Sequence, residues 1–328
     1  MELSPKAFRQ QFEEGFLELH WRQWSALGVA SHAEPEEQRL LDLEALLVST
    51  LTLGLKERRL LNAALEWLQN YGEWLNLPRL KRIARIFMKP PLASSPDIGL
   101  LLEPAVFELL GTTLHKFGRK VWTVKGPGDQ ASQKTVPSDY ASIFNNFHPR
   151  GIVTDPVMQR PPLLQMRLRG VFGVDARVET FLYLASHESG NSNSIAREIF
   201  SSQKNIYQLL DKWHQAGVLT KVQGPKIGAF TLERKNGWLH TLGLTAMPVY
   251  VHWVPVFGLL HQILKVSSVP PCSEDAYMLS SFFRDIVNEV KRLGRSLDIS
   301  VADPHQYPGE RYFSPCAANI LEVINKLK

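Results

Sequence analysis

The sequence predicts a mainly α-helical protein that carries a single short β-hairpin. Apolar residues recur at three- and four-residue spacing through most of the 328 residues, which is the pattern of amphipathic helices. The spacing changes to alternation only after Gly217, where two short runs, 218–222 and 229–232, surround a Gly-Pro turn. Because single hydrophobic cores stop growing near ~250–300 residues, we expect more than one domain.

We expect four regions along the chain. Residues 1–122 form a helical domain, 123–165 an irregular linker, 166–241 a domain of three helices and the hairpin, and 242–328 a C-terminal helical region. The linker is expected because residues 125–162 are rich in Gly, Pro and Ser. Its glycines do not predict a phosphate-binding loop, since no Gly-Lys-Ser/Thr follows at the required spacing.

The first region is expected to be a bundle of helices whose ends are marked by local signals. Gly54 and Gly72 end two of them, and Pro78 lies in the first turn of another. The expected helices cover residues 8–19, 42–53, 57–71, 77–87 and 103–117. The fourth carries a basic cluster, which we interpret as a solvated helix face or, as the alternative, a second phosphate-facing surface. This cluster is Arg79, Lys81, Arg82, Arg85 and Lys89.

The third helix of the 166–241 region has the clearest pattern. Ser202 is expected to cap its start, and the chain is expected to leave it at Gly217. Its apolar residues fall at i, i+3, i+4 and i+7 and form one face: Ile206, Leu209, Leu210 and Trp213. This face predicts a helix that packs on one side only.

Two shorter helices are expected before it. Asp175 caps the first, and Ser194 caps the second. Only Phe200 and Ser201 separate the second helix from the third, so these two must turn sharply on each other. Gln165 to Gly173 leads into the first helix. If this segment is extended, Arg167 and Arg169 share one side, where they are exposed or touch phosphates. The shared core is expected to contain Val178, Phe181, Ile206, Leu210, Trp213 and Phe230.

These residues resemble the winged helix-turn-helix transcriptional regulators of the arsenic-repressor and multiple-antibiotic-resistance repressor groups. The resemblance lies in SIAREIF (194–200), SQKNIYQLLDKWHQAGVL (202–219) and GPKIGAFTL (224–232), and it covers about a fifth of the chain. It implies a winged helix-turn-helix, three helices plus a β-hairpin wing, between helical N- and C-terminal regions. Winged helices also serve as protein-interaction modules, so the resemblance is less specific for DNA binding.

The resemblance implies that the third helix enters a major groove of duplex DNA. Base edges are then expected nearest Gln203, Lys204 and Gln208. The residues expected on or near phosphates are Tyr207, Lys212 and, in the wing, Lys221 and Lys226. Ser202, the cap, completes the DNA-binding set. Asp211 is a departure, because an acidic group on this side weakens affinity unless it pairs with a cytosine amino group or a neighbouring lysine.

The charge distribution also favours residues 166–241 as the DNA-binding region. The net charge is +5, and residues 166–241 hold 10 basic and 6 acidic residues, which is almost all of the excess. A basic surface attracts the phosphate backbone without regard to sequence.

Cellular location is predicted from what the sequence lacks. No early charged-then-apolar segment indicates a signal peptide. The most apolar run, 247–266, contains Pro248, Pro255 and Lys265, so it is expected to be buried rather than to cross a membrane. The chain has two cysteines, which are too few for a disulfide framework and are consistent with the reducing cytoplasm.

No constellation of residues predicts catalysis. The chain has no Gly-x-Ser-x-Gly elbow, no Cys-x-x-Cys and no dinucleotide fingerprint. His252 and His261 are nine residues apart rather than at the i, i+4 spacing of a helical metal pair. Asp303 and His305 lie in a Pro/Gly-containing loop, where such a pair is common by chance. We therefore expect no catalytic residue, no metal ligand, no cofactor and no enzymatic activity.

The sequence thus predicts a cytoplasmic DNA-binding transcriptional regulator. Its expected partners are double-stranded DNA and a second copy of the chain in a homodimer, with no membrane. The helices outside the winged helix would supply dimerisation or signal input. The alternative is a winged-helix protein-interaction subunit, or an antitoxin-like partner without sequence-specific DNA binding. A third hypothesis is an enzyme of unknown chemistry in the C-terminal region.

Overall fold

The computed structural model describes residues 3–90, 98–119, 138–222 and 228–328. It is mainly helical, and its described residues form one sheet, in which β1 (Leu219–Lys221) pairs with β2 (Phe230–Leu232) in antiparallel fashion. Two hydrophobic cores divide the molecule into a large helical body and a smaller unit built from residues 164–244.

The helical body combines both ends of the chain. Its N-terminal part contains α1 (Pro5–Ala26), α2 (Leu43–Leu53), α3 (Arg58–Tyr71), α4 (Leu77–Phe87), α5 (Pro104–Lys116) and α6 (Ser138–Asn145). Its C-terminal part contains α12 (Trp253–Val266), α13 (Ala276–Asp285), α14 (Val287–Ser296) and α15 (Phe313–Leu327). Because α1 packs against α15 and α12 against α2, these two parts share one core.

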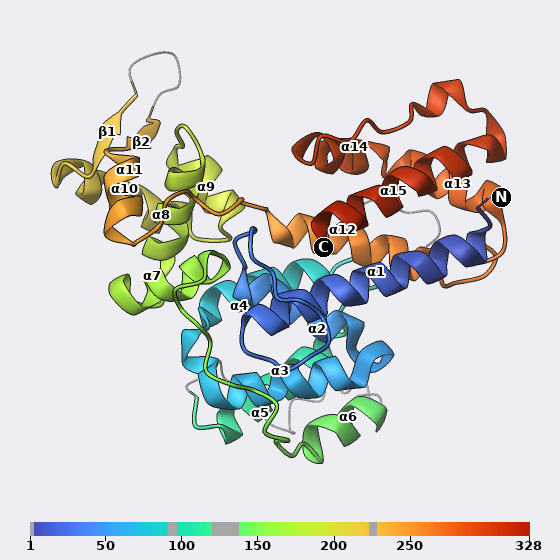
Figure 1. The fold of residues 1–328 in the computed structure, drawn as a ribbon, viewed down its shortest axis with the longest axis horizontal. Coiled ribbons are helices and arrows are strands. Elements are labelled where there is room, and N and C mark those ends of the chain that lie inside the picture. The colour runs from blue at the N-terminus through green and yellow to red at the C-terminus, as the bar shows by residue number, and fades with distance from the viewer. Residues whose placement is uncertain (1–2, 91–97, 120–137, 223–227) are drawn as a thin grey trace.

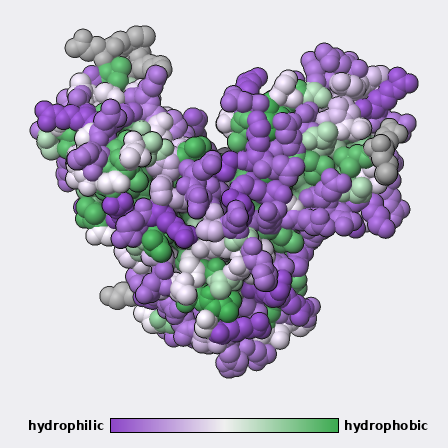
Figure 2. Space-filling view, in the orientation of Figure 1, coloured by the Kyte–Doolittle hydropathy of each residue, from purple (hydrophilic) through white to green (hydrophobic). Residues whose placement is uncertain are grey.

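The arrangement leaves two arms. The smaller unit forms one arm, and α13 to α15 form the other, both above the N-terminal helices in the view of Figure 1. Figure 2 shows that the surface is hollowed between these two arms and that hydrophilic residues prevail around the hollow on this face.

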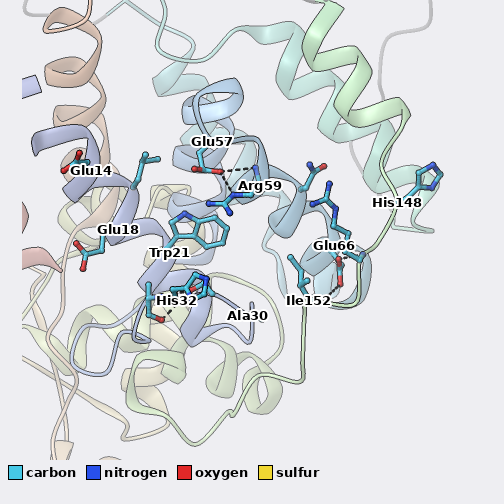
Figure 3. A pocket seen from close by; sticks show the side chains of 15 residues that line it. Glu14, Glu18, Trp21, Ala30, His32, Glu57, Arg59, Glu66, His148 and Ile152 are labelled. Carbon is cyan, nitrogen blue, oxygen red and sulfur yellow. Dashed lines mark hydrogen bonds and ion pairs between the residues drawn. The ribbon is translucent and has the colours of Figure 1, made fainter. Parts of the chain in front are cut away.

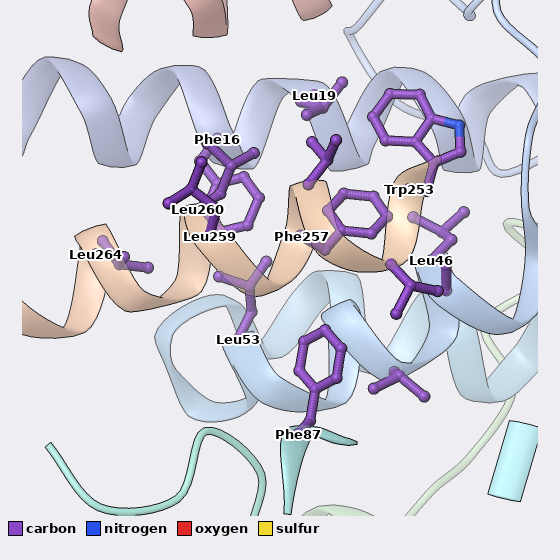
Figure 4. Close-up of a cluster of buried hydrophobic side chains, with 14 of the residues drawn as sticks. Phe16, Leu19, Leu46, Leu53, Phe87, Trp253, Phe257, Leu259, Leu260 and Leu264 are labelled. Atoms are coloured by element: carbon purple, nitrogen blue, oxygen red, sulfur yellow. The ribbon is translucent and has the colours of Figure 1, made fainter. Parts of the chain in front are cut away.

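The centre of the body is aromatic and aliphatic. Phe16 on α1 and Phe257 on α12 have ring centroids 6.3 Å apart, while Leu46 on α2 and Phe87 on α4 lie on the other side of α12 (Figure 4). The apolar run that contains α12 is buried here, as expected. Within the described residues, no helix has both the length and the apolar character that crossing a membrane requires.

A chain of polar side chains crosses this apolar core. His20 Nδ1 lies 2.8 Å from the carbonyl oxygen of Phe16, and His20 Nε2 lies 2.8 Å from Ser49 Oγ. Ser49 Oγ in turn lies 2.8 Å from Nε2 of His261. Because a carbonyl oxygen only accepts, His20 carries its proton on Nδ1, so Ser49 donates to His20 and accepts from His261. Burial lowers the pKa of His20 to about 4, so the ring is neutral near pH 7. The chain links α1, α2 and α12.

The smaller unit contains the expected three helices and hairpin in the expected order. Its elements are α7 (Leu164–Phe172), α8 (Ala176–Ser186), α9 (Ser192–Glu198), α10 (Gln203–Gln215), β1, β2 and α11 (Lys235–Thr241). Thr220 stands opposite Thr231 in the hairpin. Of the six residues expected in the shared core, five are buried: Val178, Phe181, Ile206, Leu210 and Phe230. Trp213, the sixth, is partly buried and packs against the edge of this core.

Other expectations are corrected at the ends of elements. Residues 123–165 were expected to be irregular, and residues 123–137 of this segment lie outside the described residues. The described part is not irregular throughout, because α6 forms there and buries Phe144 in the core of the body. Asn191, rather than Ser194, is the N-cap of α9. Ser194, the third residue of the helix, accepts a hydrogen bond from the Asn191 N–H with its Oγ. Residues 165–173 are helical rather than extended, since they form most of α7.

Candidate nucleic-acid interface

Helix α10 is anchored by one narrow face. Ser202 Oγ accepts a hydrogen bond from the Asn205 N–H at 3.5 Å and caps the helix as expected. Ile206 and Leu210 are fully buried, and no other residue of α10 is. Leu209, Trp213 and His214 are partly buried beside this face, and the opposite side of the helix is free to carry polar side chains.

The expected DNA-contacting residues of α10 do lie on its outer side. The exposed ones are Gln203, Lys204, Tyr207, Gln208 and Lys212, while Ser202 is half-buried. The side-chain amide of Gln203 donates to Ser192 Oγ at 2.9 Å, which ties it to the start of α9. The ring of Tyr207 is 59% exposed.

Asp211 interrupts this polar side. Its Oδ2 accepts a hydrogen bond from the side-chain amide of Gln215 at 2.8 Å. The hydrogen-bond partner of this carboxylate is therefore the amide of Gln215 one turn further along the helix, and not a neighbouring lysine. Its negative charge remains on the surface beside Lys204 and Gln208.

The hairpin contributes one described lysine. Lys221 is exposed on β1, and its Nζ lies 5.9 Å from the centroid of the Phe230 ring on β2. This cation–π contact holds the ammonium group near the hairpin surface. Lys226, the other expected wing residue, lies outside the described residues.

The turn between α9 and α10 is held by the body. Phe200 has φ +56°, which is a strained conformation for a bulky residue. Arg82 Nη1 on α4 donates to the carbonyl oxygen of Phe200 at 3.0 Å, and Arg79 Nε donates to the carbonyl oxygen of Ile199 at 3.1 Å. The Arg79 guanidinium also lies 6.0 Å from the Phe200 ring centroid. Two arginines of α4 therefore fix the angle at which α10 leaves α9.

Arg79 belongs to a buried ionic network that joins the body to the smaller unit. Arg169 on α7 donates to both carboxylate oxygens of Glu44 at 2.8 Å and also pairs with Glu179 on α8. Arg79 pairs with the same Glu44 at 2.6 Å and with Asp42. The sequence did not reveal this network, and the interpretations of Arg79 as a solvated residue and Arg169 as an exposed or phosphate-touching one are wrong.

The pKa values of the acids show how strongly the network is buried. Burial alone would raise the pKa of Asp42, but the adjacent Arg79 guanidinium outweighs burial and holds that pKa below its ordinary value. At Glu179 burial prevails over the attraction of Arg169, so the pKa of this carboxyl is raised.

A large cavity lies elsewhere, in the helical body. It has a volume of about 680 Å³ and opens between α1, α3 and residues 148–152, with Trp21 at its centre (Figure 3). Glu57 lies 3.6 Å from Arg59 across its rim. The carboxylate of Glu66 accepts the backbone N–H groups of residues 150, 152 and 153, so its role is to hold this segment against α3.

The histidines considered for metal or catalytic roles are dispersed. His261 belongs to the buried polar chain of the body, while His252 lies with its ring 5.7 Å from that of Phe200. Asp303 Oδ1 accepts the His305 N–H, which makes a local turn. Among the residues that the structure describes, no group of three or more His, Cys, Asp or Glu is placed to hold a metal ion.

Comparison of the chain with protein-family models, with curated proteins and with solved structures finds no match.

Proposed function

We propose that α8 to α10 and the β1–β2 hairpin form a winged helix-turn-helix and that the chain is a DNA-binding transcriptional regulator. The observation that carries the proposal is the outer side of α10. This helix buries only Ile206 and Leu210 and exposes a stripe of hydrogen-bonding and basic side chains. A helix held in this way by a preceding helix and a short turn is suited to enter a major groove.

In this mechanism the start of α10 lies deepest in the groove. Lys204 and Gln208 are one turn apart and face base edges, because amide and ammonium groups match the donor and acceptor patterns there. Tyr207, Lys212 and the hairpin's Lys221 lie near phosphates, which positions the helix without reading sequence. No step requires a cofactor. Cys272 and Cys316 are both free, and we place the protein in the cytoplasm, where thiols stay reduced.

The first test of the proposal separates charge neutralisation from base reading. Lys204→Ala should weaken binding to duplex DNA and lower the slope of log affinity against log salt by about 0.9 if its ammonium group also neutralises one phosphate. Gln208→Ala should leave this slope unchanged and relax the preference at one base pair by about 1–3 kcal/mol. Fluorescence anisotropy over a salt series measures both quantities.

Lys116→Ala is the matched control, since Lys116 is an exposed helical lysine on α5 in the body. It should bind as the parent does. If all variants fold and bind duplex DNA identically, α10 is not a DNA reader. The exposed Tyr207 would then favour the protein-interaction role.

We also expect a homodimer, held by helices outside the smaller unit. Two half-sites about one helical turn apart multiply the affinity of helix-turn-helix proteins, so a two-fold dimer is the usual form. Light scattering should give twice the monomer mass at micromolar protein, at least in the presence of DNA. A monomer mass with and without DNA contradicts this expectation.

A further inference from the structure

Helix α4 has a buried face and a basic face. Its side chains buried against the body are Leu80, Ile83, Ala84 and Phe87. Arg82 and Arg85 follow each other at i, i+3 on the opposite side, and Lys89 continues the same stripe just beyond the end of the helix. Arg85 and Lys89 are exposed, and the residues of α4 include no acid.

The basic stripe begins beside the start of α10. Arg82 touches the α9–α10 turn at the carbonyl oxygen of Phe200, and it lines a cavity of about 180 Å³ together with Asn205 in the first turn of α10. Successive helical residues are ~100° apart, so Asn205 stands about a quarter of a turn from Lys204. Helix α4 therefore approaches the start of α10 at Arg82.

We propose that the DNA-binding surface continues from α10 onto α4, where Arg85 and Lys89 contact the phosphate backbone of the same duplex. This inference rests on the proposed function. Arg85 and Lys89 are ~6 Å apart along the helix axis, and phosphates of one strand are spaced ~3.4 Å along the duplex, so the two side chains can reach two phosphates of one strand. These contacts add affinity and fix orientation, but they carry no sequence information.

The test uses the full chain and a fluorescent duplex over a salt series. The double variant Arg85→Gln, Lys89→Gln removes two charges and leaves Arg82, which holds the α9–α10 turn, in place. We expect the slope of log affinity against log salt to fall by about 0.9 for each phosphate that is no longer neutralised, thus by up to ~1.8, with unchanged base preference. Lys116→Gln on α5 is the matched control and should keep the parent slope.

The outcomes distinguish the two proposals. A parent slope in the double variant, with weakened binding in Lys204→Ala, overturns the α4 contact and leaves DNA reading by α10 intact. A reduced slope in the double variant and a parent slope in Lys116→Gln support the α4 contact. If the parent protein shows no salt-dependent binding to duplex DNA, both proposals fail.

Discussion

Replacing Arg169 by methionine should lower the free energy of unfolding by about 3–5 kcal/mol. Arg169 is 2% exposed and compensates Glu44 and Glu179, which are themselves buried. Methionine fills much of the same volume without a charge, so Glu179 would lose its arginine partner and Glu44 would keep only Arg79 in a buried site. Breaking a buried ion pair from one side is costly because the remaining charge stays uncompensated. Urea unfolding followed by circular dichroism measures the loss.

Arg167→Met is the matched control on the same helix. Arg167 is only partly buried, and substitutions outside buried networks usually change stability by about 0.5 kcal/mol or less. The network also joins α7 and α8 to the body, so the Arg169 variant should loosen the smaller unit first. Equal losses in the two variants would contradict the structural role of the network.

Acidification should destabilise the protein through His20. The pKa of this buried imidazole is lowered from 6.5 to about 4, because burial disfavours the charged ring. Between these values the unfolded chain binds a proton that the folded chain does not, so the free energy of unfolding falls as the pH drops from 6.5 to about 4. Above pH 6.5 the contribution of His20 to stability is fully present. The expected loss is about 3 kcal/mol, since one pKa unit corresponds to 1.36 kcal/mol.

Other groups also titrate near this window. The pKa of His261 is also lowered, first by burial and then by the charge of His20, so it acts in the same direction as His20. Burial raises the pKa of Glu179, so protonation of Glu179 acts in the opposite direction. The pKa of Asp42 is lowered below its ordinary 3.8, so its contribution is lost only at lower pH.

Unfolding at a series of pH values measures the expected loss, and NMR titration of the imidazole assigns it to His20. The variant His20→Gln keeps an amide that can hydrogen-bond to Ser49, and its stability should depend less on pH in this window. A His20 pKa near 6.5 in the folded protein contradicts the buried polar chain.

The helices of the body were largely predictable because their ends depend on local signals. Asp42 caps α2 through a hydrogen bond from the Ala45 N–H, and Gly54 ends that helix with φ +50°. The helical spacing of apolar residues over 273–293 predicts one continuous helix there, and this is wrong, since two helices, α13 and α14, meet at Ile286. Both halves keep apolar residues at helical spacing, so periodicity alone could not reveal the break.

The candidate interface was predictable only where it follows from helical period. The position of Ile206 and Leu210 on one side fixes which side chains of α10 point outwards, and the structure agrees. The support of the α9–α10 turn was not predictable, because Arg79 and Ile199 are 120 residues apart. An arginine on an amphipathic helix is expected to be exposed until its buried partners are known.

Selection of bound duplexes from a random DNA pool tests the central proposal most directly. A winged helix that reads DNA with α10 should enrich one recurring sequence, and the parent should prefer the enriched duplex over a scrambled one at every salt concentration. Gln208→Ala should lose part of that preference while keeping the salt dependence. A pool that stays random after repeated rounds, with binding insensitive to salt, contradicts DNA reading by this protein.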